Sequence, residues 1–169
     1  YSCRRFPTFW NVLTEMTGLS RIFHRSKLLN GWKMGDFDHK MERDVDQPAG
    51  AALMVKKDLL DELSGLDEQF PMFFSDVDLC RRIKDLGKRV VFYPDAVITH
   101  RGGSTMLGRR PGLIVSSHLS LIRYFLKHHR GIMDVIPNLL ITFLLLIGIP
   151  FRIIGNLIFP RRQMKRQTL

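Results

Sequence analysis

The chain has 169 residues, of which 45% are hydrophobic and 25% charged, a composition that excludes a disordered protein and suits one folded domain with an appendage. Its two cysteines, Cys3 and Cys80, are too few for a disulfide framework or a zinc knuckle. Residues 1–100 sum to zero charge, whereas residues 101–169 hold 11 basic residues against one acid, so the net charge of +10 lies in the tail. A neutral globular part joined to a basic, apolar tail predicts a partner with an anionic surface.

The first half of the chain predicts short helices separated by loops. Residues 8–19 have helical spacing, with a predicted core stripe of Trp10, Leu13 and Met16. Residues 30–48 are rich in Asp and Gly, which predicts a long loop. Residues 51–55 form an apolar run of strand length, and residues 56–63 predict a short helix that ends before Gly65.

A second helix is predicted over residues 76–86, with its apolar face made of Leu79, Cys80, Ile83 and Leu86. Residues 90–93 and 96–99 are β-type runs separated by a Pro-Asp turn. The order strand, helix, helix, strand predicts an α/β domain.

The tail differs in composition from the rest of the chain. Residues 113–126 predict a helix, and residues 135–159 form an apolar run in which Arg152 is the only charge. The uncharged part of that run, residues 135–151, would be about 26 Å long as a helix, against about 30 Å of hydrocarbon in a bilayer. We therefore expect two domains: a globular α/β domain over residues 1–112, and a basic, membrane-associating helical tail over residues 113–169.

Three Asp-x-Asp sequences are candidate ligands for a divalent cation, because hard cations prefer oxygen ligands. Two of them, residues 36–38 and 44–46, are interpreted as solvated loop acids. The third, residues 76–78, stands at the predicted start of a helix. There Ser75 and Asp78 have the spacing of a capping box, a structural explanation that still leaves Asp76 available for catalysis.

His100 ends a β-type run and precedes Gly102 and Gly103. A single histidine is more often structural than functional. A histidine that leads into two glycines can instead be a metal ligand on a tight loop, and the glycines let the backbone approach a phosphate.

Four blocks in order resemble glycosyltransferase family 2, and most closely its rhamnosyltransferase-like members, which build bacterial surface polysaccharides. The blocks are residues 45–55 (VDQPAGAALMV), 65–70 (GLDEQF), 73–82 (FFSDVDLCRR) and 90–104 (VVFYPDAVITHRGGS). Several blocks in the right order are far harder to obtain by chance than one short motif.

The resemblance implies a GT-A fold, a Rossmann-like α/β domain, of which this chain would be the carboxy-terminal half without the nucleotide-binding strands. It implies that Asp76 is the general base of an inverting sugar transfer and that His100 helps to hold a Mg²⁺ or Mn²⁺ ion. It also places Asp46, Ser75 and Asp78 in the loop that meets the acceptor, with Gly102 and Gly103 near a phosphate. The family usually has an acid where this chain has Ser75, and an aromatic residue near Gln47.

The partners implied are a nucleotide-sugar donor, a glycan or lipid-linked acceptor and the cytoplasmic face of the cell membrane, with which the chain would associate peripherally or by a single pass. On this interpretation the chain alone is not expected to catalyse sugar transfer. Two alternatives remain: a non-catalytic, membrane-associated relative, and a basic nucleic-acid-binding protein. The second is disfavoured, and no nucleic acid is expected as a partner, because the basic residues flank an aliphatic run and do not alternate with aromatic residues.

Overall fold

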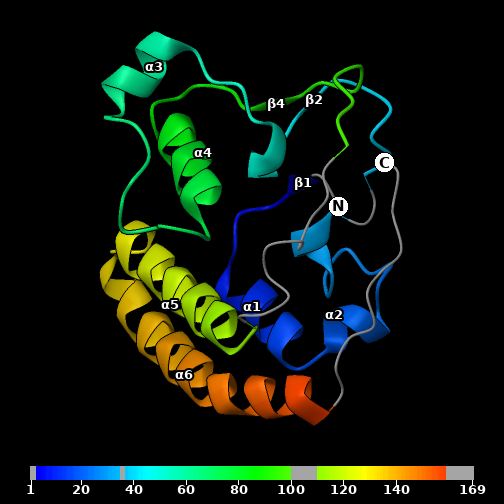
Figure 1. Ribbon diagram of the computed structural model, residues 1–169, viewed down its shortest axis with the longest axis vertical. Helices are drawn as coiled ribbons and strands as arrows, with labels where there is room; N and C mark the ends of the chain where they lie inside the picture. Colours follow the sequence, from blue (N-terminus) through cyan, green and yellow to red (C-terminus); the bar gives the residue numbers. More distant parts are fainter. Residues whose placement is uncertain (1–2, 35–36, 100–109, 159–169) are drawn as a thin grey trace. The chain divides into compact units, whose positions relative to one another are not determined.

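The computed structural model describes residues 3–34, 37–99 and 110–158 (Figure 1). The chain forms two compact units, Tyr1–Ala96 and Val97–Leu169. The domain boundary that the sequence predicts between residues 112 and 113 stays a prediction. In the described residues, α5 has already begun at that point.

The first unit is a set of short elements around one small core. Its strands are β1 (Cys3–Arg4), β2 (Arg43–Asp44), β3 (Gln47–Pro48) and β4 (Val91–Phe92). Its helices are α1 (Phe9–Met16), α2 (Leu19–Ile22), α3 (Lys57–Glu62) and α4 (Ser75–Asp85), with 3-10 turns η1 (Gly31–Lys33) and η2 (Gly50–Ala52).

Only antiparallel pairs of two-residue strands occur in the described part of this unit. Strand β1 pairs with β3, with Cys3 opposite Pro48, and β2 pairs with β4, with Asp44 opposite Val91. An α/β architecture with a continuous parallel sheet is therefore not evident in the described residues, although the helices and strands do alternate along the chain.

The strand predicted over residues 51–55 is wrong. The segment opens with η2, and the residues after it have no strand partner among the described residues. Leu53 has extended backbone angles, with φ −123° and ψ 119°. Leu53 and Val55 pack against the core while Met54 between them is 97% exposed, so the apolar pattern reflects an extended edge of the core without a sheet ladder.

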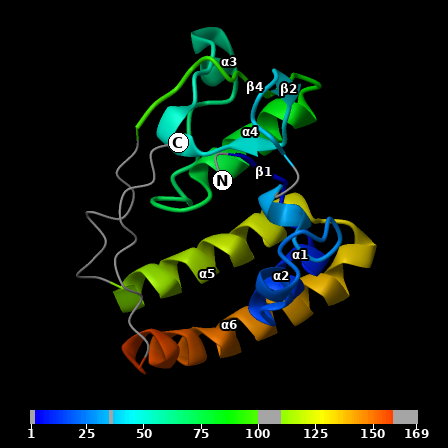
Figure 2. The same ribbon diagram turned by 90° about the vertical axis from the view of Figure 1, so that its right-hand side faces the viewer.

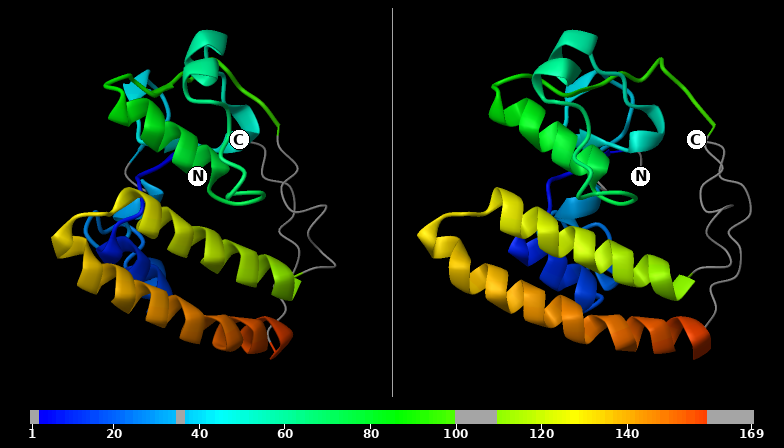
Figure 3. Two further views of the ribbon diagram at one scale, coloured as in Figure 1. Left: turned by 90° about the vertical axis from the view of Figure 1, so that its left-hand side faces the viewer. Right: turned by 60° about the vertical axis from the view of Figure 1, so that its left-hand side comes forward.

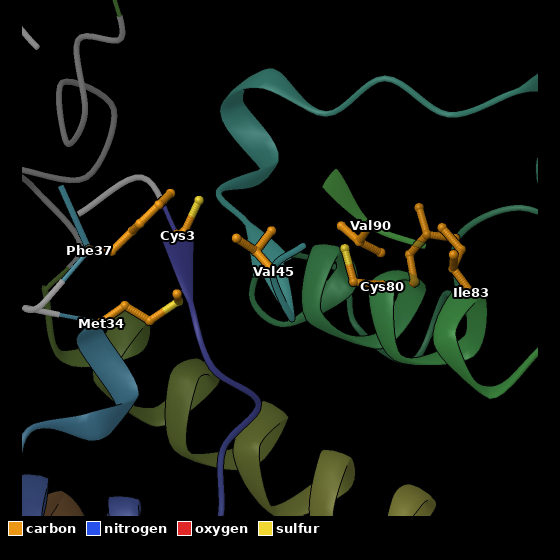
Figure 4. Close-up of a cluster of buried hydrophobic side chains, with 8 residues drawn as sticks. Cys3, Met34, Phe37, Val45, Cys80, Ile83 and Val90 are labelled. Atoms are coloured by element: carbon orange, nitrogen blue, oxygen red, sulfur yellow. The ribbon is translucent and has the colours of Figure 1, made fainter. Parts of the chain in front are cut away.

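The core of the first unit joins residues from five separate segments of the chain. Its buried members are Cys3, Met34, Phe37, Val45, Leu79, Cys80, Ile83 and Val90 (Figure 4). Helix α4 contributes three of them, which confirms most of its predicted apolar face. Leu86, predicted on that face, is 43% exposed, because the helix ends at Asp85 and Gly87 turns the chain away with a φ of 71°.

Both cysteines are free thiols. Burial, together with the nearby negative charge of Asp76, raises the pKa of the Cys80 thiol to about 12. Cys80 is therefore a protonated, apolar core side chain at neutral pH and has no role as a nucleophile.

The second unit contains α5 (Arg110–His128), the 3-10 turn η4 (Ile132–Asp134) and α6 (Val135–Ile158). Helices α5 and α6 run antiparallel and side by side as a hairpin (Figures 2 and 3). Its turn is closed by the Asn138 side chain, which donates to the carbonyl of His129 at 2.7 Å, and by the Gly131 amide, which donates to Asp134 at 2.9 Å.

Helix α6 covers nearly all of the predicted apolar run and is longer than its uncharged part, residues 135–151. Its 24 residues give a helix of about 36 Å, enough to cross a bilayer by length and composition. Pro137 lies in the first turn, where no intrahelical N–H is needed, and Pro150 lies inside the helix without ending it.

His118 makes the stability of this unit dependent on pH. Its ring is 2% exposed, and Nδ1 lies 2.7 Å from the carbonyl oxygen of Ile114, so Nδ1 carries the proton. Burial lowers the pKa of His118 below 6.5, and the charge of Arg152 lowers it further, while the bond to Ile114 opposes both. Because the unfolded state then binds the proton more readily, stability is full above about pH 6.5 and declines as the pH falls.

We expect the unfolding temperature of the full-length protein to decline from pH 7 to pH 5, and the decline to be shallower in His118→Gln. Thermal unfolding over that range measures both slopes. Equal slopes would show that His118 does not contribute.

Candidate functional site

The candidate site is built around the first turn of α4. The helix begins at Ser75, and the residue before it, Phe74, has a left-handed backbone with φ 70°. Only a few per cent of residues other than glycine adopt this conformation, and such strain is often found at functional sites. Ser75 does not cap the helix as the capping-box interpretation expected: the cap position is Phe74, which makes no side-chain capping bond.

The carboxylate of Asp76 is held by two backbone amides. Gly50 donates to Oδ2 at 2.8 Å, and Val77 donates to Oδ1 at 2.9 Å. Each carboxylate oxygen can accept about two hydrogen bonds, so each keeps capacity for a further donor such as an acceptor hydroxyl. Asp76 is half-buried, which leaves part of its carboxylate accessible.

Gly50 is a site residue that the sequence analysis did not single out. A Cβ at this position would lie 3.0 Å from both Cβ and Oδ2 of Asp76, tighter than nearly all real contacts. Its amide is the first of η2, and it reaches a residue 26 positions later in the chain. Its only signal in the sequence is its place in the block that follows Asp46.

We expect Gly50→Ala to lower kcat by about 10²-fold, the cost of a misplacement of about 1 Å at a reacting group. The added methyl group would push the Asp76 carboxylate away from the Gly50 amide. Steady-state kinetics of the full-length protein measure the effect, with Gly112→Ala as the control because a Cβ there meets nothing within 4 Å. An equal kcat in the two variants would contradict the contact.

Asp78 lies beneath the site and is fully buried. Its Oδ2 accepts from Nε of Arg82 at 2.8 Å, within one turn of α4. The same guanidinium donates from Nη1 to the carbonyl of Leu63 at 2.7 Å and from Nη2 to that of Gly65 at 2.9 Å. One arginine thus ties the first turn of α4 to the end of α3, a structural role; the acceptor contact predicted for Asp78 stays a prediction.

Asp46 stands just before β3, which packs against α4. Its Oδ2 accepts from the amide of Phe6 at 2.8 Å, so it holds the segment after β1 against this strand. Its neighbour Asp44 pairs with Arg89 at 2.7 Å, and that hydrogen bond lowers the pKa of Asp44. Asp44 is therefore an exposed ion-pair partner and no candidate metal ligand, but its interpretation as a loop acid is wrong, because it lies in β2 opposite Val91.

Three predicted residues, His100, Gly102 and Gly103, lie outside the described residues, as does Asp36. Within residues 3–34, 37–99 and 110–158, no three His, Cys, Asp or Glu side chains come together as a group that fits a metal ion. The predicted metal contact of His100 stays a prediction.

The Asp76 site lies in a stretch of the chain that matches a known protein family. The family described as "Glycosyltransferase like family 2" matches residues 3–111, which include η2, α4 and the whole Asp76 site. The chain belongs to glycosyltransferase family 2. Membership confirms the resemblance stated above and supports a GT-A glycosyltransferase domain.

Two relatives from Mycobacterium tuberculosis, from strains CDC 1551 / Oshkosh and ATCC 25618 / H37Rv, are each named N-acetylglucosaminyl-diphospho-decaprenol L-rhamnosyltransferase. Each is 34% identical to this chain over 92 residues. These residues cover 53% of the chain and 29% of the relative. The matched stretch thus spans less than a third of each relative's length. No solved structure matches the chain significantly.

Proposed function

We propose that this family-2 chain is the acceptor-side part of an inverting glycosyltransferase, in which Asp76 is the general base. The observation that carries the proposal is the carboxylate of Asp76, fixed by the amides of Gly50 and Val77 inside the stretch that matches the family. A base must be positioned within hydrogen-bond reach of the proton it removes, and two backbone donors fix this carboxylate without using all its acceptor capacity.

In the proposed reaction the hydroxyl oxygen of the acceptor attacks the anomeric carbon of a nucleotide-activated sugar. The hydroxyl proton passes to Asp76 as the new C–O bond forms. The bond from the anomeric carbon to the diphosphate breaks on the opposite face, and its electron pair leaves with the nucleoside diphosphate. A single displacement of this kind inverts the anomeric carbon.

The acceptor class follows from the relatives. Their printed name describes transfer of L-rhamnose to N-acetylglucosaminyl-diphospho-decaprenol. We therefore propose a lipid-linked sugar or a growing glycan of the cell envelope as the acceptor. The apolar α6 supports a place at the cytoplasmic face of the cell membrane, near such an acceptor.

We further propose that His100 is one ligand of a Mg²⁺ or Mn²⁺ ion in the complete protein. We expect His100→Ala to raise the metal concentration needed for half-maximal activity, because one ligand is lost. Titration of the metal-stripped full-length protein with Mn²⁺ measures this. An unchanged midpoint would make His100 a structural residue.

The proposal is tested by incubating the full-length protein with labelled nucleotide sugars and a polyprenyl-diphosphate-linked acceptor. Label in the lipid extract is the expected result. Failure to transfer from any nucleotide sugar would favour the non-catalytic relative, for which Ser75 in place of the family's usual acid is the specific observation. Salt-sensitive oligonucleotide binding would instead favour the nucleic-acid alternative.

A further inference from the structure

Helix α6 has one face that packs on α5 and another that is left uncovered. The three buried side chains of α6 are Asn138, Ile141 and Leu145, spaced as one helical stripe. The same stripe continues with Arg152, two turns after Leu145, and with Asn156, one turn further. The polar residues of α6 thus lie on the side that faces α5.

The position of Arg152 agrees with this arrangement. Its positive charge lowers the pKa of His118 on α5, so the guanidinium lies on the α5 side of the helix. The only charge of the apolar run is therefore directed away from the uncovered face. The single arginine of the apolar run is therefore compatible with an apolar outer surface.

The uncovered face is apolar along the whole length of α6. At helical spacing it carries six large side chains with exposed fractions between 43% and 77%: Ile136, Leu140, Phe143, Ile147, Phe151 and Ile154. In η4 at the turn, Ile132 and Met133 are each 85% exposed. A contiguous apolar face of this kind marks an interaction site for an apolar partner.

Charge and topology favour a lipid leaflet as that partner, with α6 lying in it. If α6 crossed a bilayer, the turn between the helices, with Lys127, His128 and Arg130, would have to pass to the far side, because α5 runs antiparallel along α6 (Figure 3). Basic segments are retained on the cytoplasmic side of membranes. Helix α5 would also enter the hydrocarbon with Arg123 exposed on its surface.

We infer that the α5–α6 hairpin is a one-leaflet anchor: α6 lies in the cytoplasmic interface with its outer face in the acyl chains, and does not span the bilayer. The inference rests on the membrane association proposed above and adds its geometry. Both the turn and the basic segment after α6 (Arg161, Arg162, Lys165 and Arg166) then remain at the anionic cytoplasmic surface.

Single cysteines in the full-length protein test the geometry. Arg130→Cys marks the turn, at an exposed position outside the apolar face, and Arg166→Cys marks the segment after α6. Each is labelled with a membrane-impermeant maleimide in intact spheroplasts and in inside-out vesicles, with the parent protein as background. We expect both sites to label only in inside-out vesicles. Labelling of the two sites from opposite faces would overturn the inference and leave the proposed sugar transfer and membrane association intact.

A second measurement tests what covers the outer face. Phe143→Glu and Phe151→Glu should each increase the fraction released from membranes by about tenfold or more, since each removes a buried aromatic side chain from the lipid. Met54→Glu is the matched control, an equally drastic change at a side chain 97% exposed in the first unit, and should release none. A wild-type protein that is soluble after lysis, as a monomer or a dimer, overturns the inference together with the membrane association.

Discussion

Asp76→Asn in the full-length protein is expected to lower kcat by about 10²–10⁴-fold, the usual cost of losing a positioned general base. Asparagine keeps the size of the side chain and one oxygen that can accept from the Gly50 or the Val77 amide. It cannot take a proton from the acceptor hydroxyl. Donor affinity should be retained, because the proposed base faces the acceptor.

Single-turnover kinetics and calorimetric titration with the nucleotide sugar separate these two effects. Asp58→Asn is the matched control: the same substitution at an exposed position in the first turn of α3, which should leave kcat unchanged. Near-normal turnover in Asp76→Asn would remove the proposed base from the mechanism.

Arg82→Met is expected to have the largest effect on stability, a loss of about 3–5 kcal/mol in the free energy of unfolding. The change removes three hydrogen bonds and takes the guanidinium from Asp78, whose side chain is fully buried. A buried carboxylate that loses its countercharge is costly because it has been removed from water. Urea unfolding of the full-length protein measures the loss.

The neighbouring residue supplies a matched control. Arg81 pairs with Asp85 at 3.0 Å on the same helix, but its side chain is 31% exposed and that of Asp85 is 54% exposed. Arg81→Met should therefore cost about 1 kcal/mol or less. The double variant Asp78→Leu with Arg82→Met should recover part of the loss of Arg82→Met, because no charge then stays buried. Equal costs for the two arginines would contradict the structural role of Arg82.

Helices were the most predictable part of the fold. Apolar spacing predicted the helices observed as α3, α4 and α5. Glycines were predicted to end the first two, and Gly65 and Gly87 do have left-handed backbones. The predicted stripe of α1 was wrong: Val12 and Thr14 are buried, whereas Trp10 is 43% exposed. Trp10 instead donates its ring N–H to the carbonyl of Leu28, a contact that local spacing does not contain.

Strands were less predictable because their partners are distant in sequence. Residues 51–55 have the composition of a strand but no partner among the described residues, and the Gly50 amide is taken by Asp76. Segment 96–99 likewise forms no strand where the structure describes it. Local composition can indicate an extended, half-buried segment but not whether another strand pairs with it.

For the candidate site, the sequence predicted Asp76 and its place at the start of a helix. It did not predict Gly50 or Arg82. Their contacts join residues 26, 19 and 17 positions apart, and they depend on how η2 and α3 pack around α4. Asp78, interpreted from its spacing as a helix-capping acid, makes its bond with a residue one turn further along the same helix.

The central claim is that Asp76 activates the acceptor in a single displacement at the anomeric carbon. The most direct test is the configuration of the new glycosidic bond, determined by NMR on product made by the full-length protein from a nucleotide sugar of known configuration. The account predicts the opposite anomeric configuration from that of the donor, with no product from Asp76→Asn on the same time scale. A retained configuration would contradict it.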